Sequence, residues 1–343
     1  MSDLSSAAVE GADPGGMLGD VLAQPQQLLD AIWRVESARL PRLDAPGGLV
    51  VCGMGGSGVG GDLAAAILGA RGRRPIQSVR EYELPPWVGQ DALVLCASYS
   101  GDTEETLACF EQAGARGASR VVITTGGALA AEARAAGVPV IGVPSGFQPR
   151  AAIAYMTVAA LECATACGAG PSLRAEIEAA AGPLAARAAE WGPEGPDDSR
   201  PKVLARRLRG RMPVVFGAGA TVAVAVRWKT QLNENAEVAA CSATLPEADH
   251  NEICAWPAED MRLAVLLEDP ETNARLRRRF ELTAEVVGGA ERVSAEGDSA
   301  FERVLALVLL GDLASVYLAV LLGRDPVPVV AIERFKEGLA ARK

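Results

Sequence analysis

Short apolar runs alternate with segments of helical periodicity along most of the chain. An amphipathic helix is expected first, over 18–40, with Leu28, Leu29, Ile32, Trp33 and Val35 gathered on one side. In the rest of the first half, strands are expected over 49–52, 76–79, 92–97, 120–123 and 139–142, and helices over 62–68, 103–115, 128–136 and 151–166. Strands alternating with helices of this size predict a parallel sheet with helices on both faces.

The second half repeats the alternation. Helices are expected over 173–191 and 202–208, with a break at 192–196, where two prolines and two glycines fall within five residues. Further strands are expected over 213–216, 239–243, 263–267 and 292–294, and further helices over 221–233, 271–287 and 300–322. The two halves therefore indicate copies of one α/β unit.

The 343 residues are enough for two domains with substantial cores. The predicted fold class is α/β, with two three-layer α/β/α sandwiches over 18–167 and 170–324. Residues 1–17, rich in Ser, Gly and Asp, are expected to be a disordered leader. The prolines Pro326 and Pro328 break the chain before a last helix in the segment 325–343.

Two small-residue turns follow strands of the first half and open into helices. They are Gly53-Met54-Gly55-Gly56-Ser57-Gly58 and Ser98-Tyr99-Ser100-Gly101-Asp102-Thr103. Such a turn gathers free backbone N–H groups at the positive end of a helix dipole, which favours an anion. The corresponding turn of the second half, at 217–221, lacks the serines. The first half is therefore the one predicted to hold the phosphate of a small molecule.

Two other interpretations fit parts of these turns. Gly53-x-Gly55-x-x-Gly58 matches the dinucleotide fingerprint, with Glu81 as the ribose acid. The hydroxyl of Ser57 and the second hydroxyl-rich turn favour a phosphate instead. Ser100 or Asp102 would also serve as an ordinary helix cap, with Glu105 completing a capping box. Capping accounts for one hydroxyl and one acid, and leaves the other hydroxyls of this turn unexplained.

Composition excludes several classes of protein. The net charge of −10 argues against a general nucleic-acid partner, which needs a basic surface. No uncharged apolar run reaches the roughly 18 residues that span a bilayer, and the chain begins without a secretory signal pattern, so neither a membrane nor export is expected. Seven cysteines without a Cys-x-x-Cys motif indicate reduced thiols and a cytoplasmic location.

The residues of the two turns resemble the phosphosugar-binding signature of sugar isomerase (SIS) domains. The second half adds Asn233-Glu234-Asn235, the run from Glu247 to Glu252, and Ile332-Glu333-Arg334-Phe335-Lys336. In this order, the motifs resemble those of the bifunctional phosphoglucose/phosphomannose isomerases, which have two SIS domains and need no cofactor or metal. The resemblance extends from about residue 18 to the C-terminus.

The resemblance implies a role for each matching position. Those expected to bind the sugar phosphate are Gly56, Ser57, Ser98, Ser100 and Thr103, with Arg150 as the active-site arginine. Those expected to be catalytic are Glu234 as the base, His250 for ring opening, and Lys336, whose C-terminal helix completes the site. The resemblance also implies a homodimer in which His250 serves the partner's site. The small residue that permits rotation about C2–C3 is not placed, since Val327 and Val329 are both near Lys336.

The chemistry of isomerisation supports these roles independently. An aldose becomes a ketose when a base moves a proton from C2 to C1 through an enediol, and a partly desolvated carboxylate such as Glu234 suits that task. His250 is the only histidine and lies in a polar run, and an imidazole can exchange the proton that ring opening moves. Asp249 and Glu252 flank it, but the chain has no second histidine, so a metal site is not expected.

The predicted function is interconversion of glucose 6-phosphate and mannose 6-phosphate with fructose 6-phosphate. Plainer interpretations are a surface glutamate at a helix end for Glu234, a structural histidine for His250 and a solvated helix residue for Lys336. At the level of the whole chain, the alternatives are a non-catalytic phosphosugar-binding SIS protein and an isomerase of another sugar phosphate. A sensor of that kind would have no use for Glu234, His250 and Lys336 together.

Overall fold

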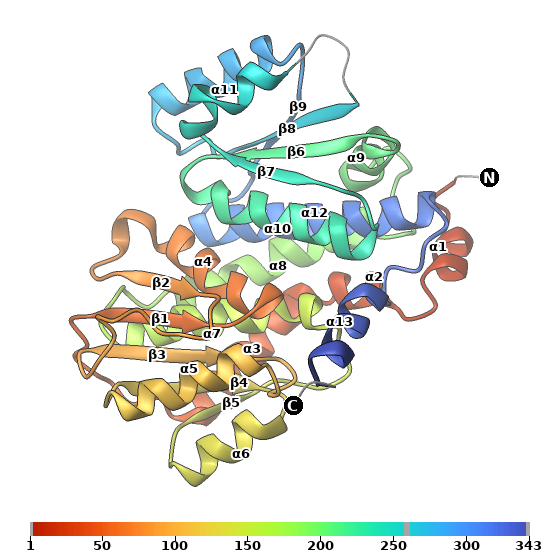
Figure 1. The fold of residues 1–343 in the computed structure, drawn as a ribbon. Helices are drawn as coiled ribbons and strands as arrows, with labels where there is room; N and C mark the ends of the chain where they lie inside the picture. The colour runs from red at the N-terminus through yellow and green to blue at the C-terminus, as the bar shows by residue number, and fades with distance from the viewer. Residues whose placement is uncertain (1–2, 257–260, 341–343) are drawn as a thin grey trace.

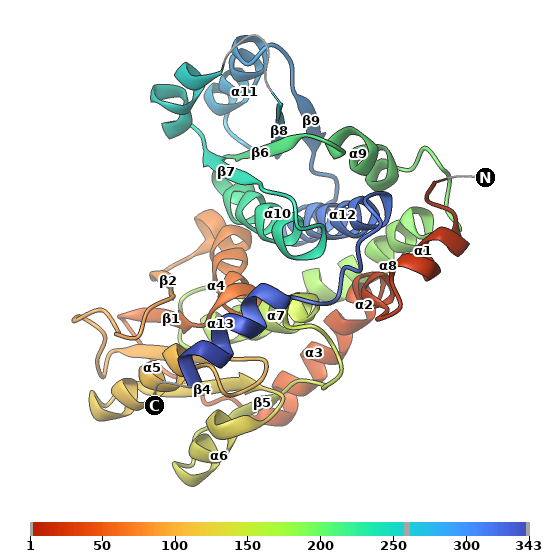
Figure 2. The same ribbon diagram turned by 45° about the vertical axis from the view of Figure 1, so that its right-hand side comes forward.

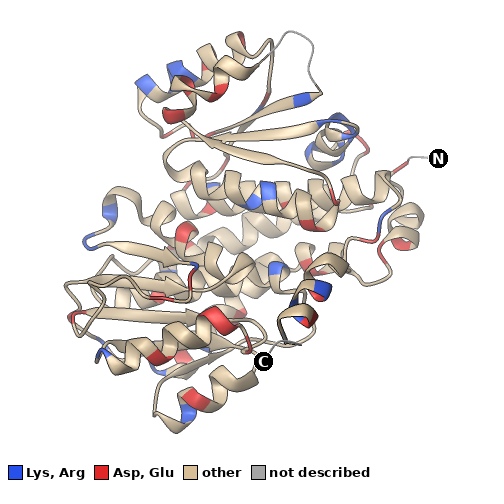
Figure 3. Ribbon diagram, in the orientation of Figure 1, with Lys and Arg blue, Asp and Glu red and all other residues tan. Residues whose placement is uncertain are grey.

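The computed structural model describes residues 3–256 and 261–340. It contains two parallel sheets, one in each half of the chain, with a layer of helices between them (Figure 1). Acidic and basic residues are interspersed over the helices of both halves (Figure 3). The predicted α/β class is confirmed.

The first sheet has the strand order β2-β1-β3-β4-β5. Its strands are β1 (Gly48–Cys52), β2 (Ile76–Val79), β3 (Ala92–Ala97), β4 (Ser119–Thr124) and β5 (Val140–Gly142). Val50 and Cys52 face a core with α5 (Glu104–Ala115) and α6 (Gly127–Ala135), whereas Leu49 and Val51 face the opposite core. This alternation along one strand produces the two covered faces.

The helices on the other face of the first sheet are α3 (Gln24–Ala38), α4 (Gly55–Leu68) and α7 (Ile153–Ala166). Helix α4 begins before the expected residue 62, in its glycine-rich stretch. A Cβ built on Gly60 would lie 2.7 Å from the backbone of Met156 in α7. The glycines therefore allow α4 and α7 to pack closely, and this tertiary contact outweighs their poor helix propensity.

The second sheet repeats the strand order as β7-β6-β8-β9. Its strands are β6 (Met212–Gly217), β7 (Cys241–Thr244), β8 (Arg262–Glu268) and β9 (Glu291–Ser294). Helix α11 (Ala274–Val286) covers one face, and α10 (Val222–Asn235) and α12 (Ala300–Leu321) cover the other, with α8 (Arg174–Trp191) and α9 (Arg200–Leu208) packed on α12. The common order supports two copies of one unit.

Helix α12 is the centre of the molecule. By length and composition it is the one described helix able to cross a membrane, and the apolar window that meets this test is entirely buried within the protein. It packs against helices of both halves, and a single apolar cluster includes residues of both sheets together with α12. The two sandwiches therefore share a core.

The expectation of a disordered leader over 1–17 is wrong for the described residues. This segment forms α1 (Ser6–Ala12) and the start of α2 (Met17–Leu22), and both helices pack on α12. Leu4 and Met17 are fully buried, and the Asp13 carboxylate accepts hydrogen bonds from the backbone N–H groups of Met17 and Leu18. A few apolar side chains are enough to order this segment because α12 offers a large apolar surface for them to pack on.

The single helix expected over 18–40 is divided into α2 and α3. The division falls at Ala23, and Pro25 occupies the first turn of α3. Proline lacks a backbone N–H and is tolerated in the first turn of a helix, so it favours a new helix start there.

The last helix, α13 (Val330–Ala340), lies beyond the ends toward which β1 and β3 point (Figures 1 and 2). Its residues from Val330 to Leu339 are exposed, whereas the preceding Pro326 is buried. Val327 packs closely on Gly15, because a Cβ built on Gly15 would lie 2.5 Å from Val327 Cγ2. The segment before α13 is therefore packed against the protein, whereas the helix itself is exposed.

Candidate active site

The two predicted phosphate turns lie side by side at the carboxyl ends of β1 and β3, which are neighbouring strands. A Cβ on Gly53 would lie 2.7 Å from the Ala97 carbonyl oxygen, and a Cβ on Gly56 would lie 3.0 Å from the Arg150 Cα. Only glycine fits these positions without displacing backbone. Ser57 is buried in the first turn of α4, where free N–H groups and the helix dipole favour an anion.

The hydroxyls of the second turn are already organised. Ser98 Oγ lies 2.8 Å from Thr103 Oγ1 and accepts the Gly101 N–H at 3.0 Å, and Ser100 Oγ accepts the Asp102 N–H at 3.3 Å. Gly101 has a φ of 81°, which other residues rarely adopt. The turn is therefore pre-ordered for hydrogen bonding to a ligand.

Helix capping does not explain the hydroxyls of this turn. Thr103 is the residue that precedes α5, and its side chain makes no capping hydrogen bond. Asp102 accepts instead from the Ala128 N–H in α6, at 2.9 Å. The capping alternative, with Ser100 or Asp102 as cap of α5, is therefore wrong.

The equivalent turn of the second sheet is closed by its own hydrogen bonds. Thr221 Oγ1 accepts the Ala218 N–H at 2.9 Å and donates to the Leu267 carbonyl at 2.8 Å. Its hydroxyl is committed within the protein. This explains why the first half, and not the second, carries the candidate phosphate site.

Arg150 lies in the short 3₁₀ helix η2 (Pro149–Ala152) and is only 3% exposed. Its Nε donates to Asn235 Oδ1 at 2.6 Å, and its Nη2 donates to the carbonyls of Pro326 and Val327. Burial is the main cause that lowers the pKa of Arg150, with the nearby Glu234 opposing the shift. The guanidinium thus joins the first half to α10 and to the segment before α13.

Glu234 lies in the last turn of α10, with its carboxylate a quarter exposed. Its Oε2 is 3.6 Å from Arg150 Nη1. The structure therefore brings together two residues that are far apart in the sequence. The pair places a proton acceptor beside a cationic hydrogen-bond donor.

His250 and Lys336 belong to other elements than that pair. His250 ends the 3₁₀ helix η4 (Glu247–His250) and is exposed, and Lys336 is exposed on α13. Among the described residues, neither side chain forms a hydrogen bond or an ion pair with Arg150 or Glu234. Asp249 ties η4 to α11, accepting from Arg279 and Thr283 at 2.8 Å each. The proposed catalytic roles of His250 and Lys336 therefore stay predictions.

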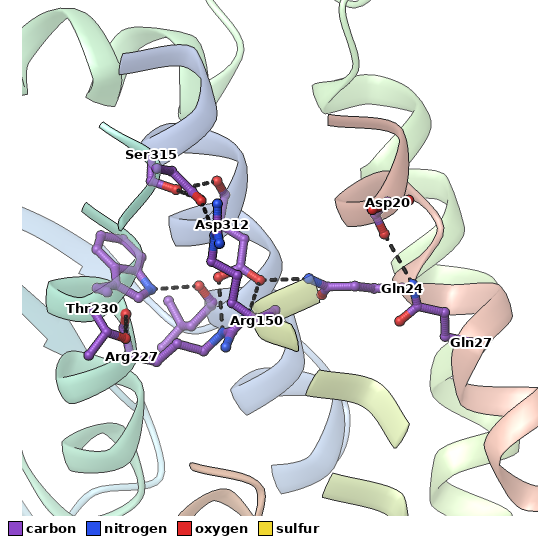
Figure 4. A network of polar contacts seen from close by, with 11 residues as sticks. Asp20, Gln24, Gln27, Arg150, Arg227, Thr230, Asp312 and Ser315 are labelled. Atoms are coloured by element: carbon purple, nitrogen blue, oxygen red, sulfur yellow. Dashed lines mark hydrogen bonds and ion pairs between the residues drawn. The ribbon is translucent and has the colours of Figure 1, made fainter. Parts of the chain in front are cut away.

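Sequence reasoning missed a buried polar network behind Arg150 (Figure 4). Asp312 of α12 pairs with Arg227 of α10 through bonds of 3.0 and 2.7 Å, and it accepts from Gln24 at 2.6 Å. Arg227 also donates to the Arg150 carbonyl at 2.9 Å. The one available signal was Asp312, an acid within the apolar run of α12.

Among the described residues, no group of three histidine, cysteine, aspartate or glutamate side chains is placed to hold a metal ion. Of the two acids that flank His250, Asp249 bonds to α11, and Glu252 is exposed in the next 3₁₀ helix, η5 (Glu252–Ala255). The groups that converge at the site are hydroxyls, backbone N–H groups, one guanidinium and one carboxylate. Such a set suits a phosphorylated, polyhydroxylated ligand.

Two sandwiches, each built on a parallel sheet, with a candidate hydroxyl-lined phosphate site on the first, are typical of SIS proteins. Residues 197–339 match the family described as bacterial phospho-glucose isomerase C-terminal SIS domain. The chain is 39% identical to the bifunctional phosphoglucose/phosphomannose isomerase of Aquifex aeolicus, over 85% of this chain and 90% of that protein. It is 35% identical to the enzyme of the same name from Caldicellulosiruptor bescii, over 86% and 90%. The chain belongs to the bifunctional phosphoglucose/phosphomannose isomerase family.

A solved structure shows the same fold at low sequence identity. The C-terminal domain of glucosamine-fructose-6-phosphate aminotransferase from Francisella tularensis superposes with a TM-score of 0.69 at 13% identity, covering 91% of this chain and 98% of that one. This similarity concerns the fold alone.

Proposed function

We propose that the protein interconverts glucose 6-phosphate and mannose 6-phosphate with fructose 6-phosphate through a cis-enediol, without a metal. The observation that carries the proposal is the Glu234 carboxylate, 3.6 Å from the buried Arg150 guanidinium, whose backbone packs against Gly56 of the first candidate phosphate turn. Membership of the isomerase family supports the same activity.

The phosphate is bound by the first half. The N-terminal end of α4 supplies N–H groups around Gly56 and the Ser57 hydroxyl, and the second turn supplies Ser98, Ser100 and Thr103. Hydrogen bonds to a charged group are worth about 1.5–3 kcal/mol each. Anchoring the phosphate here directs the far end of the hexose toward Glu234.

Ring opening is assigned to His250 and Lys336. The step moves a proton from O1 to O5 as the C1–O5 bond breaks, leaving an open-chain aldehyde. Imidazole suits this exchange because it gains and loses protons near neutral pH. Lys336, on the exposed helix α13, assists this proton transfer.

Glu234 carries out the isomerisation. It takes the proton from C2 while O1 gains one, giving the enediol, and it returns the proton to C1 while O2 loses its own, giving the ketose. Arg150 stabilises the negative charge that develops on the two oxygens. Because the enediol is planar at C2, both epimers give the same intermediate, which allows one site to serve glucose and mannose phosphates.

The proposed assembly is a homodimer with shared active sites. His250 is exposed at the surface of the second half, where a partner subunit can receive it. Helix α13 likewise exposes apolar side chains, with Phe335 67% exposed. The described cysteines are free thiols, which fits a cytoplasmic enzyme of hexose phosphate metabolism.

A coupled assay tests the activity. Purified protein is given glucose 6-phosphate or mannose 6-phosphate in the presence of EDTA, and fructose 6-phosphate is measured. Formation of fructose 6-phosphate from both epimers is expected. Binding of the phosphosugars without turnover would favour the sensor alternative, and loss of activity with EDTA would contradict the metal-free mechanism.

A further inference from the structure

We propose that Asn235 and Ser315 are positioning residues that hold the free edge of the Arg150 guanidinium against Glu234. The inference rests on the proposed function and assigns to that site two residues that act from behind it. Neither side chain is expected to contact the substrate, because Asn235 and Ser315 are both fully buried.

The first step concerns the donors of Arg150. Arginine has five N–H groups in a rigid fork. Nε bonds to Asn235, and Nη2 bonds to the carbonyls of Pro326 and Val327. Nη1 has only loose partners, at 3.5 Å from Gln148 Oε1 and 3.6 Å from Glu234 Oε2. The Nη1 edge is therefore the part of the guanidinium available to a substrate oxygen.

The second step concerns the direction of the Asn235 amide. Its Nδ2 donates to Ser315 Oγ at 2.8 Å, and Ser315 Oγ donates to the Asp312 carbonyl at 2.7 Å. Because the Ser315 hydroxyl uses its proton on that carbonyl, it accepts from the amide. The amide oxygen of Asn235 therefore faces Arg150 Nε. If the amide were flipped, its NH₂ group would face the Nε–H, and two hydrogen-bond donors would point at each other.

The third step concerns Glu234 itself. It directly precedes Asn235 at the end of α10, where a helix usually frays. Anchoring Asn235 to α12 through Ser315 fixes this last turn. The same side chain therefore sets the position of the proposed base and the orientation of the arginine beside it.

The test compares Ser315→Ala with Thr157→Val. Both substitutions remove one buried hydroxyl, but that of Thr157, in α7, has no hydrogen-bond partner among the described residues. For Ser315→Ala, we expect kcat to fall about tenfold or more, with KM for fructose 6-phosphate within about twofold of wild type. For Thr157→Val, we expect wild-type kinetics.

Asn235→Asp is a second variant that separates positioning from a general loss of stability. Its side chain keeps an oxygen for Arg150 Nε but has no N–H to donate to Ser315 Oγ. We therefore expect kcat to fall while KM for fructose 6-phosphate stays within about twofold of wild type, and the melting temperature measures any loss of stability separately.

The outcomes are distinct. Wild-type protein without isomerase activity would overturn the proposed function. Active wild type with Ser315→Ala matching Thr157→Val in kcat would overturn the positioning role. So would an unchanged kcat in Asn235→Asp, which remains informative even if Ser315→Ala fails to fold.

Discussion

Arg150 uses most of its hydrogen-bonding capacity within the protein. Its partners come from α10 and from the segment that leads to α13, and its own carbonyl is held by Arg227. Arg227 and Asp312 are a buried pair, and removing one partner of such a pair typically costs about 3–5 kcal/mol. At the scale of residues, the Arg150 guanidinium is therefore fixed by its partners, and only its Nη1 edge has loose contacts.

Glu234→Gln tests the base. The amide keeps the shape of the side chain but cannot take a proton, so the enzyme should bind fructose 6-phosphate nearly as wild type does. Exchange of the C1 hydrogen with solvent deuterium, followed by NMR, should fall at least a thousandfold. Retained exchange in this variant would remove Glu234 from the role of base.

The residues of the candidate site divide into two kinds with respect to sequence. The hydroxyl turns have a local pattern because small residues precede a helix. Glu234 has one because it lies between two amide side chains at a helix end. Arg227, Asp312 and Ser315 carry almost none, since their function depends on helices α10 and α12 being packed together. The two amides beside Glu234 also have different tasks: Asn233 accepts the Ala240 N–H at 3.2 Å, whereas Asn235 bonds to Arg150.

At the scale of elements, the alternating pattern predicted nearly every strand and most helices. The errors occurred where tertiary contacts decide. Helix α4 begins in a glycine-rich stretch because α7 packs closely on it, and α1 forms from a polar leader because α12 covers its few apolar residues. A local pattern does not contain the partner surface, so neither element was predictable from its own residues.

Helix α2 contains a carboxyl group that the fold disfavours in its charged form. Burial and the nearby Asp13 raise the pKa of Asp20 to about 6. The folded state therefore binds this proton more tightly than the unfolded chain, and its contribution to stability is lost as the pH rises through 6. We expect Asp20→Asn to raise the melting temperature at pH 7.5 and to raise it less at pH 5.

The exposed Asp91 provides the control for this comparison. Asp91→Asn should shift the melting temperature by a similar small amount at both pH values. An Asp20→Asn effect that is equal at pH 5 and pH 7.5 would show that the Asp20 carboxyl titrates normally in the folded protein.

At the scale of the whole molecule, the two sandwiches have unequal tasks around a common core. The first holds the candidate phosphate turns, and the second contains Glu234 and carries His250 on a 3₁₀ helix anchored to α11. Because His250 is exposed, its proposed role in ring opening needs either a movement of η4 or a second subunit. In the proposed homodimer, the second subunit supplies His250.

Complementation distinguishes the two courses. Inactive Glu234→Gln and His250→Ala proteins are unfolded, mixed and refolded together, and native mass spectrometry measures the heterodimer. Random pairing gives about half heterodimers with one intact site each, so about a quarter of wild-type activity is expected. Heterodimer without recovered activity would place both residues in the site of one subunit.

The position of α12 near the end of the chain affects how the protein is made. A growing polypeptide folds from its N-terminus as it leaves the ribosome. Both sheets and the helices that surround residues 300–321 are synthesised before that segment, so their shared apolar surface stays exposed until residues 300–321 have been translated. Ribosome-bound chains that stop short of residue 300 should therefore depend on chaperones, whereas chains that include α12 can bury this surface.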